Sequence, residues 1–262
     1  MKLGISTWSM LQSDLETAVR TIGDAGLEYI ELWGEVPHAY PDWTDKKRLK
    51  DALSAYSFTV TMHAPFTDLN PAAPFEPVKG AVAKTLKGFL KFSESLGAQR
   101  VTFHPGSVHS GALVPGSKKD TVELFRYLVK ESGGALAVNI ENPVGHISHY
   151  HYPVGGSADT IEPLLESVEG AGFTMDSGHA HVNGEVPAKV FDRFSGRLTE
   201  IHLSDNGGAS DDHLAPGDGT ADLKSLFDRL RGTDTLVCLE VNPFKYSPLQ
   251  VLHAAQALRA AT

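Results

Sequence analysis

Short runs rich in β-branched and aromatic residues alternate eight times with longer stretches of helical spacing along this chain. Parallel strands have to be joined by crossover connections, so this alternation indicates a parallel sheet with helices packed against it. Eight such units within 262 residues match the size of a closed (β/α)₈ barrel. The predicted strands cover residues 2–7, 27–33, 58–63, 100–104, 136–141, 172–176, 198–203 and 236–241.

An open, doubly wound sheet is the alternative arrangement of the same elements. Its hallmark is a glycine-rich phosphate-binding loop after the first strand, whereas the first strand here runs into STWSM (residues 6–10) without a GxGxxG motif. We therefore expect a single (β/α)₈ barrel domain over residues 1–262. Helix signals along the chain support the barrel. Five helix starts are indicated by Ser13 with Glu16 as a capping box, Asp45, Pro77, Ser117 and Ser157. Helical patterns also cover residues 187–194, 221–230 and 247–260.

The composition limits the compartment and the partners. Cys238 is the only cysteine, which excludes an internal disulfide and fits a reducing compartment. The N-terminal MKLGISTWSM does not have the pattern of a signal peptide, and no apolar run approaches the ~20 residues that cross a bilayer. We therefore expect a cytoplasmic protein without membrane association. A formal net charge of −9 gives no overall attraction to a polyanion.

Side chains with acid–base and metal-binding chemistry stand where the predicted strands end. In a parallel barrel these ends meet at one rim, where catalytic residues gather. Imidazole nitrogens and carboxylate oxygens suit zinc, manganese, cobalt or iron, and no thiolate is involved because Cys238 lies inside a strand. The pattern predicts a metal site at the C-terminal rim. The strand-end residues are Trp33, His63, His104, Glu141, Asp176, His202 and Glu240.

The stretch IHLSDNGGASDDHLAPGDGT (201–220) holds two histidines and four aspartates but no lysine or arginine. It is either a solvated surface loop or part of a metal site, where an ion supplies the missing positive charge.

Taken together, these motifs resemble the xylose isomerase-like TIM-barrel superfamily, which contains endonuclease IV (AP endonuclease family 2) and many sugar or sugar-phosphate isomerases and epimerases. The resemblance spans nearly the whole chain. The matching motifs are TMHAPF, FHPGS, IENPVG, MDSGHAH, IHLSDN, DDHLAPGDG and LEVNP.

The resemblance implies one to three divalent metal ions. In the sugar isomerases and epimerases, the counterparts of Glu141, Asp176, His202 and Glu240 hold one ion. In endonuclease IV, nine side chains hold three zinc ions. Their counterparts here all have the right residue type: His63, His104, Glu141, Asp176, His179, His202, Asp211, His213 and Glu240.

Two activities follow from this resemblance, and we favour the first. It is an isomerase or epimerase acting on a sugar, sugar phosphate or related polyol, in which Glu141 and Glu240 transfer a proton through a metal-stabilised enediolate and His179 holds a hydroxyl. The aromatic residues of the rim loops suit such a small sugar-like substrate. Candidate substrate-binding residues are Trp8, Trp33, Phe66, His149, His151 and Asn206.

The second activity is cleavage of abasic DNA by zinc ions, as in endonuclease IV. The complete set of nine ligands favours it. Against it, the chain opens with GISTWS instead of the usual GAH-type strand, and the rim loops contain only Lys118, Lys119 and Lys245 to contact phosphates. A metal-dependent lyase or hydrolase on a sugar-like substrate is a further alternative. The exact substrate, the metal and the oligomeric state, a homo-oligomer included, stay open.

Overall fold

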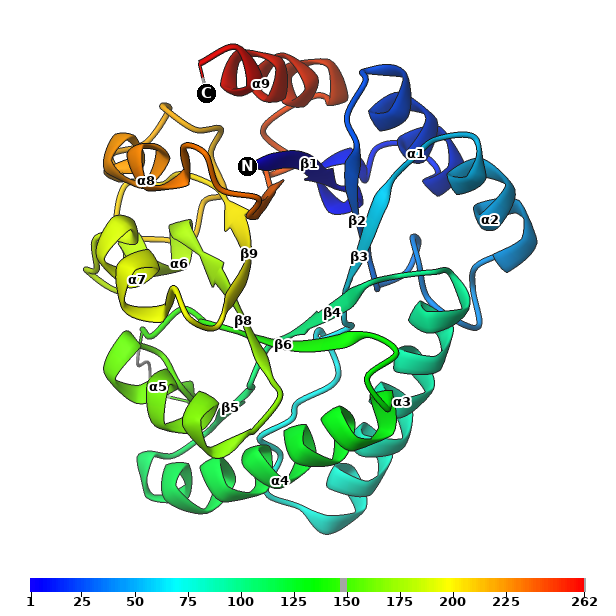
Figure 1. The fold of residues 1–262 in the computed structure, drawn as a ribbon. Coiled ribbons are helices and arrows are strands. Elements are labelled where there is room, and N and C mark those ends of the chain that lie inside the picture. Colours follow the sequence, from blue (N-terminus) through cyan, green and yellow to red (C-terminus); the bar gives the residue numbers. More distant parts are fainter. Residues whose placement is uncertain (147–149, 262) are drawn as a thin grey trace.

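Eight parallel strands close into a barrel in the computed structural model, which describes residues 1–146 and 150–261. The strands follow the order β1-β10-β9-β8-β6-β4-β3-β2, and β1 pairs with β2 to complete the ring (Figure 1). All eight predicted strands are confirmed. Their bounds are β1 (Lys2–Ser6), β2 (Tyr29–Trp33), β3 (Thr59–His63), β4 (Arg100–Phe103), β6 (Ala137–Glu141), β8 (Gly172–Asp176), β9 (Leu198–Leu203) and β10 (Leu236–Leu239).

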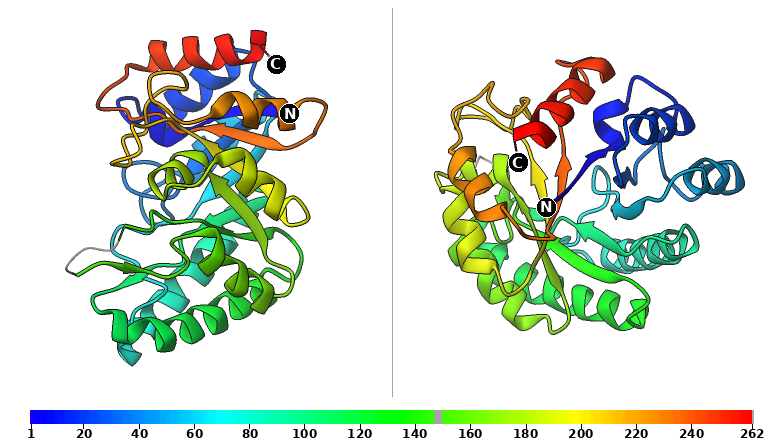
Figure 2. Two further views of the ribbon diagram at one scale, coloured as in Figure 1. Left: turned by 90° about the vertical axis from the view of Figure 1, so that its left-hand side faces the viewer. Right: turned by 45° about the horizontal axis from the view of Figure 1, so that its top comes forward.

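Helices surround the barrel on its outside, as Figures 1 and 2 show, which confirms the (β/α)₈ fold. Among the described residues, no helix is long and apolar enough to span a membrane. The helices are α1 (Leu15–Asp24), α2 (Lys46–Ser54), α3 (Glu76–Ser95), α4 (Val114–Ser132), α5 (Ala158–Ser167), α6 (Ser177–Val182), α7 (Pro187–Phe194), α8 (Leu223–Leu230) and α9 (Pro248–Ala261), with 3₁₀ turns η1 (Thr7–Met10) and η2 (Gly111–Leu113).

The two faces of a strand bury different kinds of side chain, because successive side chains point to opposite faces. Ile30 and Leu32 of β2 belong to the large apolar core. Tyr29 and Glu31 of the same strand point into the barrel, where Tyr29 donates a hydrogen bond to Glu200. The barrel interior is therefore partly polar, and its polar side chains hydrogen-bond to one another.

Two helix starts differ from the prediction. Asp14, not Ser13, caps α1, because its carboxylate accepts the backbone N–H of Thr17 at 2.8 Å and a negative charge is favoured at a helix N-terminus. The fourth helix begins at Val114 and contains Ser117, since a proline in the first turn suits a helix start. The predicted caps Asp45 and Ser157 are confirmed.

Two small elements beyond the eight units shape the barrel mouth. Helix α6 follows β8 directly, and Asp176 caps it by accepting the N–H of His179 at 2.6 Å. Strands β5 (Ser107–Val108) and β7 (Tyr152–Pro153) pair antiparallel and join two of the loops. Both elements are too short to produce a recognisable period in the sequence.

Candidate metal centre and active site

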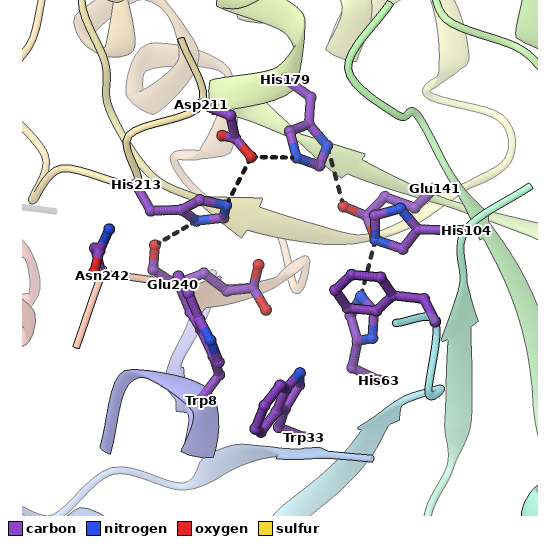
Figure 3. A pocket seen from close by; sticks show the side chains of 11 residues that line it. Trp8, Trp33, His63, His104, Glu141, His179, Asp211, His213, Glu240 and Asn242 are labelled. Carbon is purple, nitrogen blue, oxygen red and sulfur yellow. Dashed lines mark hydrogen bonds and ion pairs between the residues drawn. The ribbon is translucent and has the colours of Figure 1, made fainter. Parts of the chain in front are cut away.

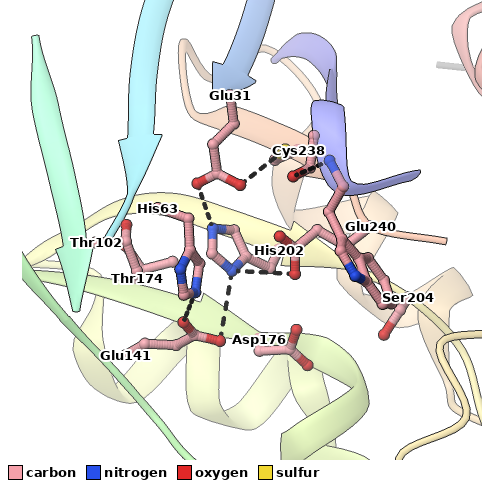
Figure 4. Close-up of polar contacts among 12 residues, drawn as sticks. Glu31, His63, Thr102, Glu141, Thr174, Asp176, His202, Ser204, Cys238 and Glu240 are labelled. Atoms are coloured by element: carbon pink, nitrogen blue, oxygen red, sulfur yellow. Dashed lines mark hydrogen bonds and ion pairs between the residues drawn. The ribbon is translucent and has the colours of Figure 1, made fainter. Parts of the chain in front are cut away.

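The nine residues predicted as metal ligands lie together at the carboxyl ends of the strands (Figures 3 and 4). Strand register places several side by side: Asp176 of β8 is opposite His202 of β9. Four groups of three have ligand atoms within 4.8 Å of one another: His63, Glu141 and His202; Glu141, Asp176 and His179; Asp176, His202 and Glu240; and His179, Asp211 and His213.

Glu141 stands at the centre of this cluster. Its Oε2 lies 3.3 Å from His63 Nε2 and 3.3 Å from His104 Nε2, and its Oε1 lies 3.4 Å from His202 Nδ1. On the other side, His202 Nδ1 is 3.4 Å from Glu240 Oε2. Two donor atoms that each lie about 2.1 Å from a tetrahedral ion are about 3.4 Å apart. These spacings therefore suit a bound divalent ion.

Three buried ligand atoms have no hydrogen-bond partner among the described residues: Glu141 Oε2, Asp176 Oδ2 and His202 Nδ1. Burying such atoms unpaired is costly, and each pair of these three residues has ligand atoms within 4.8 Å of each other. A divalent ion would satisfy them together, so the residues present fit a metal.

The histidine rings are held in fixed orientations by their outward nitrogens. A carbonyl can only accept a hydrogen bond, so each bonded ring nitrogen carries the proton and the other is free to bind an ion. The bonds run from His63 Nδ1 to Ala64 O at 2.8 Å, from His179 Nδ1 to Asn142 O at 2.8 Å, and from His213 Nδ1 to Glu240 O at 3.1 Å.

His202 is oriented by a carboxylate that the sequence analysis missed. Glu31 of β2 is fully buried, and its Oε2 accepts the Nε2–H of His202 at 3.0 Å, leaving Nδ1 to face the centre (Figure 4). A carboxylate behind a ligating histidine raises its basicity. The available signal was an acid within the apolar strand YIELW.

We expect Glu31→Gln to weaken divalent-metal binding by roughly 10–100-fold. The amide can still accept the bond from His202, but it lacks the negative charge that makes the ring a better ligand. Competition with a chelating dye measures the affinity, and Glu28→Gln is the matched control because Glu28 is exposed just before β2. Equal affinity in both variants would contradict a role for Glu31.

The acidic connector at 201–220 builds a second group of ligands. Asp211 Oδ2 lies 3.2 Å from His179 Nε2 and 3.1 Å from His213 Nε2. His213 adopts a left-handed φ of 46°, rare for a non-glycine residue. The Asp205 carboxylate closes the connector by accepting the N–H groups of Asn206, Gly217 and Ala221. The connector is therefore an ordered part of the site.

Removing this second group should cost one ion and leave the others. We expect Asp211→Asn combined with His213→Ala to remove one ion per chain, or to disorder the connector, without emptying the site of Glu141 and Glu240, which keep their own histidine partners. Elemental analysis measures the content, and Ser210→Ala is the control because Ser210 is exposed in the same connector. Loss of all metal together would show that the sites form one cooperative unit.

Burial and mutual charge shift the titration of the cluster. Burial raises the pKa of Glu240 to about 8 and lowers the pKa of His104 to about 3. Burial also opposes the charged form of His63, but Glu141 beside it raises its pKa to about 9. Without an ion, protons on histidines thus balance the carboxylates. Metal binding would displace such protons.

An aromatic-walled cavity of about 300 Å³ opens above the cluster (Figure 3). Its volume is at the lower end of the ~300–1,000 Å³ that small-molecule sites span. Trp8, Trp33 and Phe66, predicted to bind substrate, line it together with Asn242, which was not predicted. Among the described residues that line the cavity, none is a lysine or arginine.

Two further candidate substrate-binding residues, His151 and Asn206, do not line this cavity. His151 lines a neighbouring groove instead of the cavity. The structure does not bring Asn206 to the cavity: its side chain is buried, donates to Gly178 O at 2.8 Å and accepts the Gly208 N–H at 2.8 Å, so it orders the connector. His149 lies outside the described residues.

Comparison with known proteins agrees with the fold and the motifs. Fructoselysine 3-epimerase of Escherichia coli O157:H7 is 25% identical over 275 residues, covering 98% of this chain and 96% of the relative. Inosose dehydratase of Lacticaseibacillus casei is 24% identical over 290 residues, covering 94% of each. The crystal structure of a D-tagatose 3-epimerase-like protein superposes with a TM-score of 0.87 at 21% identity, covering 99% of this chain and 96% of the other.

The model of one protein family matches residues 19–261, nearly the whole chain. Its description, xylose isomerase-like TIM barrel, is the family that the sequence motifs predicted. The chain therefore belongs to the xylose isomerase-like TIM-barrel family.

Proposed function

We propose that this protein is a divalent-metal-dependent isomerase or epimerase acting on an uncharged sugar. The observation that carries the proposal is the placement of Glu141 and Glu240 on two sides of His202, each 3.4 Å from its Nδ1, in one cavity. The names of the relatives, which include sugar 3-epimerases, support this class of reaction.

When bound, a divalent ion would polarise the carbonyl and the neighbouring hydroxyl of the sugar, so that the hydrogen on the adjoining carbon becomes acidic. Glu141 ends β6 and Glu240 follows β10, and two strands separate β6 from β10 in the barrel. The two carboxyl groups therefore reach a substrate from different sides. One removes the proton and the other returns it, which inverts the carbon or moves the carbonyl. His179 lines the cavity, and with its Nδ1 bonded to Asn142 O it would hold a substrate hydroxyl through Nε2, which lies 3.2 Å from Asp211 Oδ2.

The charges around the cavity favour a sugar without phosphate. A phosphate needs cationic or backbone N–H partners, and the described lining residues include no lysine or arginine. Lys245, a cation of the rim loops, is paired with Asp212 at 2.7 Å. The faces of Trp8, Trp33 and Phe66 suit the apolar faces of a sugar ring.

Exchange in heavy water tests the proposal. Incubated with a panel of ketoses, ketose derivatives and ketocyclitols, the protein should place solvent deuterium on the carbon beside the carbonyl, and EDTA should abolish this. Isomer formation is followed in parallel, because a hydride shift changes the sugar without exchange. If no sugar in the panel shows deuterium exchange or isomer formation, the proposal is refuted. Loss of water from the substrate would indicate a dehydratase, as inosose dehydratase is among the relatives.

The group His179, Asp211 and His213 favours one alternative, an endonuclease IV-like phosphodiesterase, since it would supply further metal positions for a phosphate. Such an enzyme would nick a duplex that carries an abasic site, with affinity falling steeply as salt rises. Metal-dependent nicking at ordinary salt, without deuterium entering any sugar, would establish it.

A further inference from the structure

A second groove adjoins the catalytic cavity. It has a volume of about 440 Å³, larger than the roughly 300 Å³ above the metal cluster. The two share the lining residues Phe66, His104, His179 and Asp211, so they adjoin at these side chains. From there the groove extends to His151 and Pro153. The reacting carbons of a sugar need only the part beside Glu141 and Glu240.

The walls of the groove are hydrogen-bonded to one another. Asn70, in the loop after β3, donates to Ser107 O at 2.7 Å and accepts the Ser107 N–H at 3.1 Å. Val154 donates its N–H to Gly106 O at 2.9 Å, beside the β5–β7 pair. Gly106 fits there because a Cβ would come within 2.3 Å of Asn70 Oδ1. The groove is therefore formed before any ligand enters.

The chemistry of the groove suits an uncharged, partly apolar group. Leu69, Pro71, Pro143 and Val144 provide apolar surface, and neutral polar groups lie among them. Among the described residues that line it, none is a lysine, arginine or glutamate, and its one aspartate is Asp211, which contacts His179 and His213. The remaining titratable side chains among these described lining residues are the histidines His104, His151 and His179, so the groove offers no permanent cation to a charged substituent.

We propose that the groove is a subsite for an uncharged substituent carried by the sugar, so that the substrate is a neutral sugar derivative larger than a free monosaccharide. This rests on the proposed function for the reaction itself. Phe66 stands at the junction, stacked on His104 with ring centroids 4.7 Å apart, and is 41% exposed. A group linked by an ether or glycosidic bond to a carbon remote from the carbonyl would pass this ring and fill the groove.

The test compares ketoses with derivatives that differ only at a remote carbon: the free ketose, its 6-O-benzyl ether, its 6-O-glucosyl derivative and its 6-phosphate. We expect KM in the deuterium exchange assay to be at least tenfold lower for the two neutral derivatives than for the free ketose, with no gain for the phosphate. Thr67→Trp should abolish the gain and leave the free ketose unchanged, because Thr67 is exposed and lines the groove. The exposed neighbour Asp68, outside the groove lining, provides the control Asp68→Trp.

Equal KM values for free and substituted ketoses, or an equal loss for both in Thr67→Trp, would overturn the subsite. Metal content and circular dichroism establish that the variant is folded. If no sugar exchanges hydrogen or forms an isomer, the proposed function has failed, and calorimetric titration of wild type and Thr67→Trp with the 6-O-benzyl ether then decides the subsite alone. The subsite is supported if the wild type binds the 6-O-benzyl ether more tightly than the free ketose and Thr67→Trp does not. It is refuted if the wild type binds the two compounds equally.

Discussion

Replacing Glu141 by Gln should lower turnover by about 10²–10⁴-fold, the usual contribution of a general acid or base, and Glu240→Gln should do the same. Both side chains lie in the cavity, and each faces His202 at 3.4 Å. An amide cannot accept the substrate proton, and it is also a weaker metal ligand than a carboxylate. The loss therefore combines proton transfer with metal binding.

Saturation with metal separates these two contributions. Turnover is measured by deuterium exchange over a range of metal concentrations, and a loss that persists at saturation belongs to proton transfer. Glu169→Gln, an exposed glutamate between α5 and β8, is the control for the substitution itself. Circular dichroism should show an intact barrel in every variant. Near-normal turnover in Glu141→Gln or Glu240→Gln would remove that residue from the mechanism.

Removal of metal by a chelator is expected to abolish activity and to lower the melting temperature. A ligand present at 1,000 times its dissociation constant stabilises the folded state by about 4 kcal/mol. For a chain of this size that corresponds to a shift of about 10 °C. The buried carboxylates Glu141, Asp176 and Glu240 would then stand close together with only histidine protons to balance them.

The measurement is a thermal melt of the untagged protein before and after EDTA dialysis, followed by re-addition of zinc, manganese, cobalt or iron in turn. Elemental analysis of the untreated protein gives the stoichiometry. About one ion per chain supports the isomerase-type site, whereas about three supports a role for the group around Asp211. Full turnover and an unchanged melting temperature after metal removal would contradict the metal-dependent mechanism.

The sequence by itself determined the barrel and most of its rim. Eight strand–helix alternations leave few ways to bury the apolar face of each element, and parallel strands carry their C-terminal ends to the same side. His63, Glu141 and Asp176 each end a strand, so their convergence followed from local pattern alone. Two helix starts were harder to predict: Asp14 and Ser13 compete to cap α1, and α4 begins at Val114 with a proline in its first turn and no side-chain cap.

Only the tertiary structure decided how these residues are supported and what surrounds them. Glu31 and His202 are 171 positions apart, and their contact depends on the shape of the closed barrel. The short helix α6, which orients His179, produces no periodic pattern in the sequence. The same holds for the hydrogen bond by which the Asn206 side chain donates to Gly178 O. The groove beside the cavity likewise arises from loops joined by long-range hydrogen bonds such as Asn70 to Ser107, which local sequence preferences do not specify.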